Sequence, residues 1–114
     1  MKDDRVYLLH VRDAIERIRS YTAAGQGPFM ADTRTQDAVI RNLEIIGEAV
    51  KRLSENTRSR RPDIPWSRIA GMRDVLIHQY FGVKLETVWE VVAHHLSPLS
   101  AAVADILIDL PSRS

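Results

Sequence analysis

The amino-acid sequence predicts an all-α protein, a bundle of four or five helices in a single domain. Apolar residues recur every three or four positions along three long segments, which is the period of a helix with one buried face. No stretch alternates between apolar and polar residues as a half-buried strand would. With 114 residues, 45% of them hydrophobic, residues 1–114 are long enough for one compact core.

The first helix is expected from residue 3 to about residue 24, with Gly25 as its stop. Residues 26–28 are predicted to form a turn, after which Phe29 folds back onto the core. His10 has no second ligand at useful spacing and is interpreted as a surface or packing residue. The apolar face of this helix is formed by Leu8, Val11, Ile15 and Ile18.

The second helix is expected to start at Asp32 or Thr33 and to run to about Asn56. Its apolar positions step by four, three, four and three residues, a heptad-like stripe that faces the core and possesses enough apolar surface for a partner. Gly47 allows another helix to approach closely. The stripe consists of Val39, Leu43, Ile46, Val50 and Leu53, broadened by Ile40 and Ile45.

Two carboxylates lie one turn apart on this second helix. Glu44 and Glu48 are like charges at i,i+4. One interpretation is a solvated acidic face. The other is that one of them reaches Arg73 or His78 farther along the chain.

The third and last helices are punctuated by proline and glycine. Pro65 suits the first turn of the third helix, Gly71 is expected to loosen or bend it, and Gly82 to stop it. A last helix from about Lys84 is expected to break or kink at Pro98.

Composition limits the possible chemistry. The chain has no cysteine, which excludes disulfides and thiolate metal sites. His94 and His95 are adjacent, so their side chains point about 100° apart on a helix and are not expected to share a metal. The sequence has neither the apolar run of a signal peptide nor about 20 consecutive apolar residues, which predicts a cytoplasmic protein without membrane association.

Positive charge is concentrated in one segment, although the formal net charge is only +1. Residues 51–73 carry seven basic and two acidic side chains. Such a local excess suggests an anionic partner such as nucleic acid. The alternative is that Arg58, Arg60 and Arg61 belong to a solvated loop.

Residues 73–80, with the sequence RDVLIHQY, hold several chemically capable side chains. Arg73 offers a planar fork of donors for phosphate. His78 can transfer protons near neutral pH. Asp74 lies four residues before His78 and could orient its imidazole. Tyr80 offers a hydroxyl that can hydrogen-bond, stack or be modified.

The spacing of this segment does not bring its groups together automatically. Arg73 and His78 are five residues apart, roughly 140° around a regular helix. Three arrangements would join them: a helix that bends or ends near His78, an arginine that reaches around the helix, or a cleft shared by two copies of the chain.

Arginine and histidine without metal ligands suit RNA cleavage through the ribose 2′-hydroxyl. Histidine takes or gives a proton, while arginine stabilises the charge that builds on the phosphoryl oxygens. Such a reaction needs no metal and no cofactor. The alternative is a buried, hydrogen-bonded histidine with no role in catalysis.

The pattern R-x-x-x-x-H-x-Y resembles the motif of the HEPN superfamily, and specifically its HepT-like branch of toxins. The resemblance extends to residues 37–53, to Pro-x-x-Pro-Trp at residues 62–66, to residues 69–72 and to Val88-Trp89. It implies a homodimeric helical bundle in which paired motifs face an interface cleft. It also implies a metal-independent ribonuclease toxin that cleaves tRNA or mRNA, with Arg73 and His78 catalytic and Asp74 supporting them.

The same resemblance implies a partner. In this branch a minimal nucleotidyltransferase antitoxin of the MntA type attaches AMP to the tyrosine that Tyr80 matches. Added AMP places anionic bulk in the cleft and would block RNA. The alternative function is a non-catalytic module that binds RNA or a nucleotide and assembles with such a nucleotidyltransferase.

Overall fold

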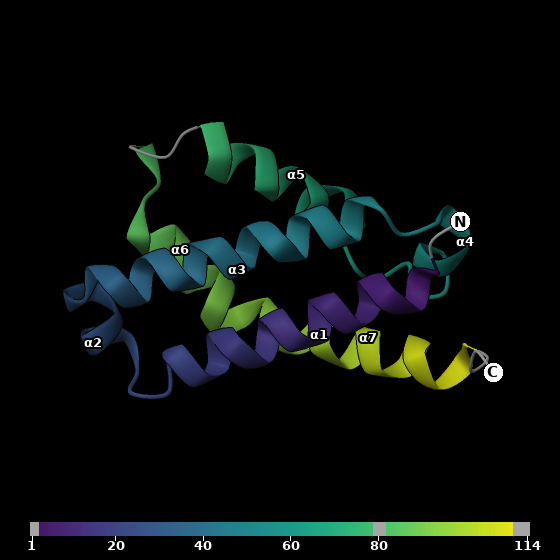
Figure 1. Cartoon of the computed structure of the whole chain (residues 1–114), viewed down its shortest axis with the longest axis horizontal. Coiled ribbons are helices and arrows are strands. Elements are labelled where there is room, and N and C mark those ends of the chain that lie inside the picture. The colour runs from purple at the N-terminus through teal and green to yellow at the C-terminus, as the bar shows by residue number, and fades with distance from the viewer. Residues whose placement is uncertain (1–2, 79–81, 111–114) are drawn as a thin grey trace.

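The computed structural model describes residues 3–78 and 82–110, and every regular element within them is a helix (Figure 1). This confirms the all-α class for the described part of the chain, which measures 44 × 28 × 25 Å. Two of the helices, α2 and α4, are short. The helices are α1 (Asp4–Tyr21), α2 (Gln26–Ala31), α3 (Thr33–Lys51), α4 (Glu55–Arg58), α5 (Trp66–His78), α6 (Leu85–His94) and α7 (Leu96–Asp109).

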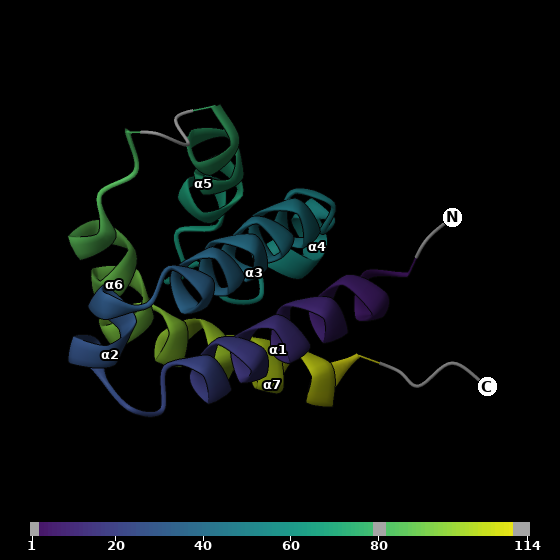
Figure 2. The same ribbon diagram turned by 60° about the vertical axis from the view of Figure 1, so that its left-hand side comes forward.

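Helix α3 is the central element of the fold. It packs against α1 on one side and α5 on the other, while α7 packs along α1 (Figures 1 and 2). The stripes expected on the first two helices are confirmed as core-facing, because each of their main apolar residues is buried: Leu8, Val11, Ile15, Ile18, Val39, Leu43, Ile46, Val50 and Leu53. In Figure 2, α5 stands apart from α1 and α7.

The turn predicted at residues 26–28 is wrong, because these residues begin α2. Gly25, with a φ of 97°, makes the sharp change of direction before it, and the ring of Pro28 is tolerated in the first turn. Phe29 does fold back onto the core as expected. It is 1% exposed, and its ring centroid lies 5.3 Å from that of Trp89.

Helix α3 ends at Lys51, earlier than the expected Asn56. The chain restarts as α4, whose N-cap Ser54 accepts a hydrogen bond from the Thr57 backbone N–H at 3.2 Å. The hydroxyls of Ser54 and Thr57 both donate to the Asp4 carboxylate of α1. These hydroxyl contacts compete with the continuation of α3.

Pro98 was expected to break or kink the last helix at its own position, but the break lies three residues earlier. α6 ends at His94, α7 begins at Leu96, and the two helices are bent by 44°. Proline removes the hydrogen bond to the carbonyl four residues before it, which here belongs to His94. Pro98 itself is accommodated in the first turn of α7.

Among the described residues, no single helix is long and apolar enough to cross a bilayer. Only α6 and α7 taken together reach that length and composition, and they are bent at their junction.

Candidate active site

Arg73 is held against α3 by a carboxylate. Its Nε lies 2.8 Å from Oε2 of Glu48, and its Nη1 lies 3.0 Å from Oδ1 of Asp74. The other oxygen of Glu48, Oε1, is 3.0 Å from Nε of Arg52. Glu48 therefore contacts two arginines, Arg73 of α5 and Arg52 at the C-terminal end of α3. The contact fixes the direction of the Arg73 side chain.

The close approach of α5 to α3 depends on Gly47. A Cβ atom at Gly47 would lie 2.8 Å from Cβ of Arg73, 3.1 Å from its backbone nitrogen and 3.2 Å from the carbonyl oxygen of Ile69. A Cβ atom has no room at these distances, so the close packing of the two helices requires glycine here. The prediction that Gly47 lets another helix approach is confirmed, and the residue opposite it is Arg73.

Two interpretations of the paired glutamates were open, and the one in which a glutamate reaches Arg73 is confirmed for Glu48. Glu44 instead pairs with Arg41 on its own helix at 3.5 Å. The helical spacing identified the pair, but not which member reaches α5.

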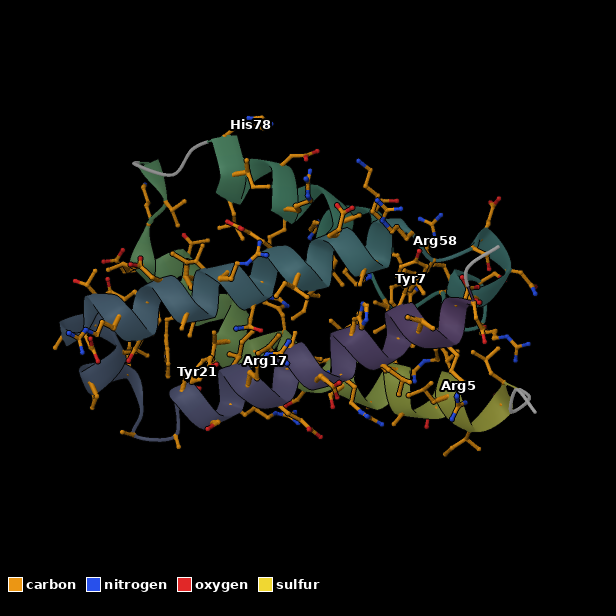
Figure 3. All side chains as sticks on the ribbon, viewed as in Figure 1. Arg5, Tyr7, Arg17, Tyr21, Arg58 and His78 are labelled. Atoms are coloured by element: carbon orange, nitrogen blue, oxygen red, sulfur yellow. The ribbon has the colours of Figure 1, made fainter. Side chains whose placement is uncertain are left out.

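His78 lies at the outer end of α5, away from α1 (Figure 3). It is exposed, which contradicts the alternative of a buried, hydrogen-bonded histidine. α5 continues through Gly71 without interruption up to His78, which is the last described residue of this segment. Asp74 contacts Arg73 and makes no hydrogen bond to His78 within the described residues.

Tyr80, the fourth residue of the candidate site, lies outside the described residues. Its expected role therefore stays a prediction.

Arg73 opens onto a surface groove of about 510 Å³ between α1, α3 and α5. Ile77, one turn beyond Arg73, also lines it, whereas His78 does not. His10 from α1 and Arg52 line the same groove. The sequence had indicated a surface or packing residue at His10, and Arg52 only as one member of the basic segment. A polar stripe in the sequence was the signal that could have found it: Arg41, Glu44, Glu48 and Arg52 share one face of a helix.

The basic segment is not simply a solvated loop. Arg61 pairs with Asp63 at 2.9 Å and with Asp105 of α7 at 2.7 Å, and its carbonyl accepts the Trp66 indole N–H. The hydrogen bond with Asp63 raises the pKa of Arg61. Arg58 is half-buried, whereas Arg60 is exposed. Part of the positive charge predicted here is thus neutralised within the chain.

Comparison with known proteins points to one family. The model of the family described as "Ribonuclease HepT-like" matches residues 11–106, which include Glu48, Arg73 and His78. The "Probable ribonuclease HepT" of Thermococcus cleftensis is 44% identical over 94 residues, covering 82% of this chain and 86% of that protein. A "Putative RNase" of Caldanaerobacter subterraneus subsp. tengcongensis is 40% identical over 111 residues, covering 94% and 96%.

A third relative is about twice as long as this chain. The "Gamma-glutamylcyclotransferase and putative RNase" of Methanocaldococcus jannaschii is 43% identical over 110 residues, which are 96% of this chain but 50% of that protein. The chain thus spans half the length of that relative. No solved structure gave a significant match.

Proposed function

Because the chain belongs to the HepT-like ribonuclease family, we propose that residues 1–114 form a single-domain ribonuclease of the HEPN type, the toxin of a toxin–antitoxin pair. The observation that carries the proposal is the anchored arginine. Arg73 is turned by Glu48 toward an open groove, and it lies five residues before an exposed histidine at the end of the same helix. An anchored guanidinium beside open surface is suited to an RNA phosphate.

The proposed reaction uses His78 and Arg73 without a metal. The His78 imidazole removes the proton of a ribose 2′-hydroxyl, whose oxygen forms a bond to phosphorus. The bond from phosphorus to the 5′-oxygen breaks, and that oxygen takes up a proton. Arg73 stabilises the negative charge on the phosphoryl oxygens. The products are a 2′,3′-cyclic phosphate and a 5′-hydroxyl.

We place this reaction in a cleft between two copies of the chain. Within one copy, Arg73 is drawn toward α3 by Glu48, while His78 is exposed and does not line the groove. Two apolar side chains of α5 beside them, Val75 and Ile77, are 52% and 41% exposed. A symmetric dimer that covers them would bring the arginine of one copy near the histidine of the other.

The test of the function is cleavage of single-stranded RNA by the purified protein in the presence of a chelator. We expect products ending in a 2′,3′-cyclic phosphate, and a loss of rate of at least 100-fold, roughly, for His78→Ala and Arg73→Ala. Arg12→Ala is the matched control, because Arg12 is an exposed arginine paired with a neighbouring aspartate at 3.2 Å. Cleavage that survives both changes would rule out this site.

Regulation by AMP attachment to Tyr80 is part of the proposal and rests on the family resemblance. The cytoplasmic partner would be a nucleotidyltransferase antitoxin of the MntA type. Intact mass after co-expression with that partner should increase by whole AMP units, and Tyr80→Phe should abolish the increase. An unchanged mass in the parent chain would remove this part of the proposal.

One observation favours a second function, a non-catalytic module that binds RNA or a nucleotide for the nucleotidyltransferase. Both carboxylate contacts of Arg73 are already made, and His78 does not share its groove within one copy. If this alternative holds, we expect the chain to bind the nucleotidyltransferase tightly and to cleave no RNA at any protein concentration.

A further inference from the structure

The groove that contains Arg73 also gathers basic side chains from α1 and along α3. Arg41 lines it from α3, Arg52 from the residue that follows α3, and His10 from α1. Two carboxylates, Glu44 and Glu48, lie among them. The three arginines of the groove outnumber its two carboxylates.

The arginine side chains along α3 are more exposed to solvent than the glutamate side chains they pair with. The side chain of Arg41 is 72% exposed, and that of its partner Glu44 is 17% exposed. Arg52 is 57% exposed, and its partner Glu48 is 37% exposed. A polyanion that approaches the groove therefore meets guanidinium groups first, although each arginine–glutamate pair carries no net charge.

The two exposed arginines mark out a line along α3. Arg41 and Arg52 are eleven residues apart, which is about 16 Å along a helix axis and nearly the same angular position. Arg73 reaches this line from α5, through its contact with Glu48. The spacing suits successive phosphates of a single strand better than one small anion.

Glu48 leaves part of Arg73 available for a ligand. The carboxylate takes up Nε, and Asp74 takes up Nη1. Within the described residues, Nη2 of Arg73 has no hydrogen-bond partner. A guanidinium held at two of its nitrogens loses less conformational entropy when the third, Nη2, binds a phosphate.

We propose that the groove between α1, α3 and α5 binds the RNA backbone, with Arg41 and Arg52 contacting phosphates beside the one held by Arg73 and with Glu48 as the residue that positions Arg73. This inference rests on the proposed ribonuclease function and names how its substrate lies. Arg41 and Arg52 contribute to binding. Glu48 acts through Arg73.

Binding is tested on intact protein with a single-stranded RNA carrying 2′-O-methyl groups, which cannot be cleaved through the 2′-hydroxyl. Fluorescence anisotropy should show that Arg41→Ala and Arg52→Ala each weaken binding several-fold, and together about tenfold. Each should reduce the slope of log affinity against log salt concentration by about 0.7, the value for one phosphate contact on a single strand. Arg12→Ala should stay within about twofold of the parent. Parent-like affinity and salt slope in both groove variants would overturn the proposal.

The positioning role of Glu48 is tested by separating binding from turnover. Glu48→Gln removes a negative charge from the groove, so binding of the 2′-O-methyl RNA should be unchanged or tighter. The kcat on cleavable RNA should fall about tenfold or more, because Arg73 loses its charged anchor. Glu48→Asp should recover part of the kcat. A fall in kcat that simply follows the fall in Tm across both variants would mean that Glu48 is only structural.

The two proposals fail in different ways. If the parent binds RNA through Arg41 and Arg52 but never cleaves it, the ribonuclease function fails and the groove stands. If the parent cleaves RNA through His78 while Arg41→Ala and Arg52→Ala bind normally, the groove fails and the ribonuclease stands.

Discussion

At the residue scale, Gly47 controls where Arg73 lies. Gly47→Ala would place a methyl group 2.8 Å from Cβ of Arg73 and close to two backbone atoms of α5. Backbone atoms cannot move aside individually, so α5 must shift away from α3. We expect a loss of about 1–3 kcal/mol in the free energy of unfolding, measured by urea denaturation, together with loss of the Arg73–Glu48 contact and of cleavage.

Gly71 provides the matched control on the same helix. A Cβ there meets nothing within 4 Å, and the residue is exposed inside α5. Gly71→Ala should therefore stabilise the protein by about 0.5–1 kcal/mol and leave cleavage unchanged. Equal stabilities of the two variants would contradict the steric role assigned to Gly47.

A second residue-scale prediction concerns Asp4, whose carboxylate ties α1 to α4. Burial acts to raise the pKa of Asp4, but hydrogen bonds from Ser54 and Thr57 and the charge of Arg58 outweigh it, so the pKa lies below its usual value. A lowered pKa means that this carboxylate stabilises the fold above the unfolded pKa of about 3.9. The contribution is lost as the pH falls through the lower, folded pKa.

Asp4→Asn should consequently be less stable than the parent by about 1 kcal/mol between pH 5 and pH 7. The difference should shrink as the pH falls below about 4. Urea midpoints measured across this range give the test, with Asp13→Asn as the control, because Asp13 is half-exposed and pairs with its exposed neighbour Arg12 at 3.2 Å. A difference that grows toward acid would refute the assignment.

At the element scale, apolar spacing was enough to predict the long helices but not their ends. The stripe on α3 continues to Leu53, which is buried, yet the helix stops at Lys51. The hydrogen bonds of Ser54 and Thr57 to Asp4 decide that end, and they join residues about 50 positions apart. Likewise, Pro98 indicated that the last helix breaks, but the break lies next to His94. The carbonyl of His94 loses its hydrogen-bond donor because proline has no backbone N–H.

A prediction at this scale concerns the polar contact between α1 and α3. Nε of Arg17 donates to Oδ1 of Asn42 at 2.8 Å, and Asn42 is only 5% exposed. Asn42→Ala should cost about 1–2 kcal/mol, because it removes a buried partner. The cycle of Asn42→Ala with Arg17→Met should show a coupling energy of about 1 kcal/mol in urea denaturation.

The neighbouring arginine of α1 makes the control cycle. Arg12 pairs with Asp13, and among the described residues the hydrogen bond to Oδ1 of Asn42 comes from Arg17. Asn42→Ala and Arg12→Met should be additive within about 0.5 kcal/mol. Additivity in the Arg17 cycle as well would mean that the contact does not stabilise the packing of the two helices.

At the scale of the whole molecule, the sequence named candidate residues for the site but not their arrangement. Its motif identified Arg73 and His78, and the like-charged pair on α3 included the anchor Glu48. The groove required the tertiary contact of α5 with α3, because no local pattern links His10 to Arg73. In the proposed cleft, Arg73 and His78 meet only across two copies of the chain, and the support for a second copy is the exposure of apolar residues of α5 such as Val75 and Ile77, which the structure shows and the sequence does not.

The final prediction tests that shared cleft by mixing two inactive variants. If each cleft takes Arg73 from one copy and His78 from the other, a mixed dimer of Arg73→Ala and His78→Ala has one fully intact cleft. After subunit exchange, about half of the dimers are mixed and each has one of its two clefts restored, so about a quarter of the parent cleavage rate should return. Mixing Arg73→Ala with the double variant restores no cleft and should stay inactive. If both groups came from the same copy, every cleft in the first mixture would lack one of them, and no activity would return. If the parent chain is a dimer through the exposed face of α5, Val75→Asp, which places a charge on that face, should be a monomer in light scattering and should not cleave RNA.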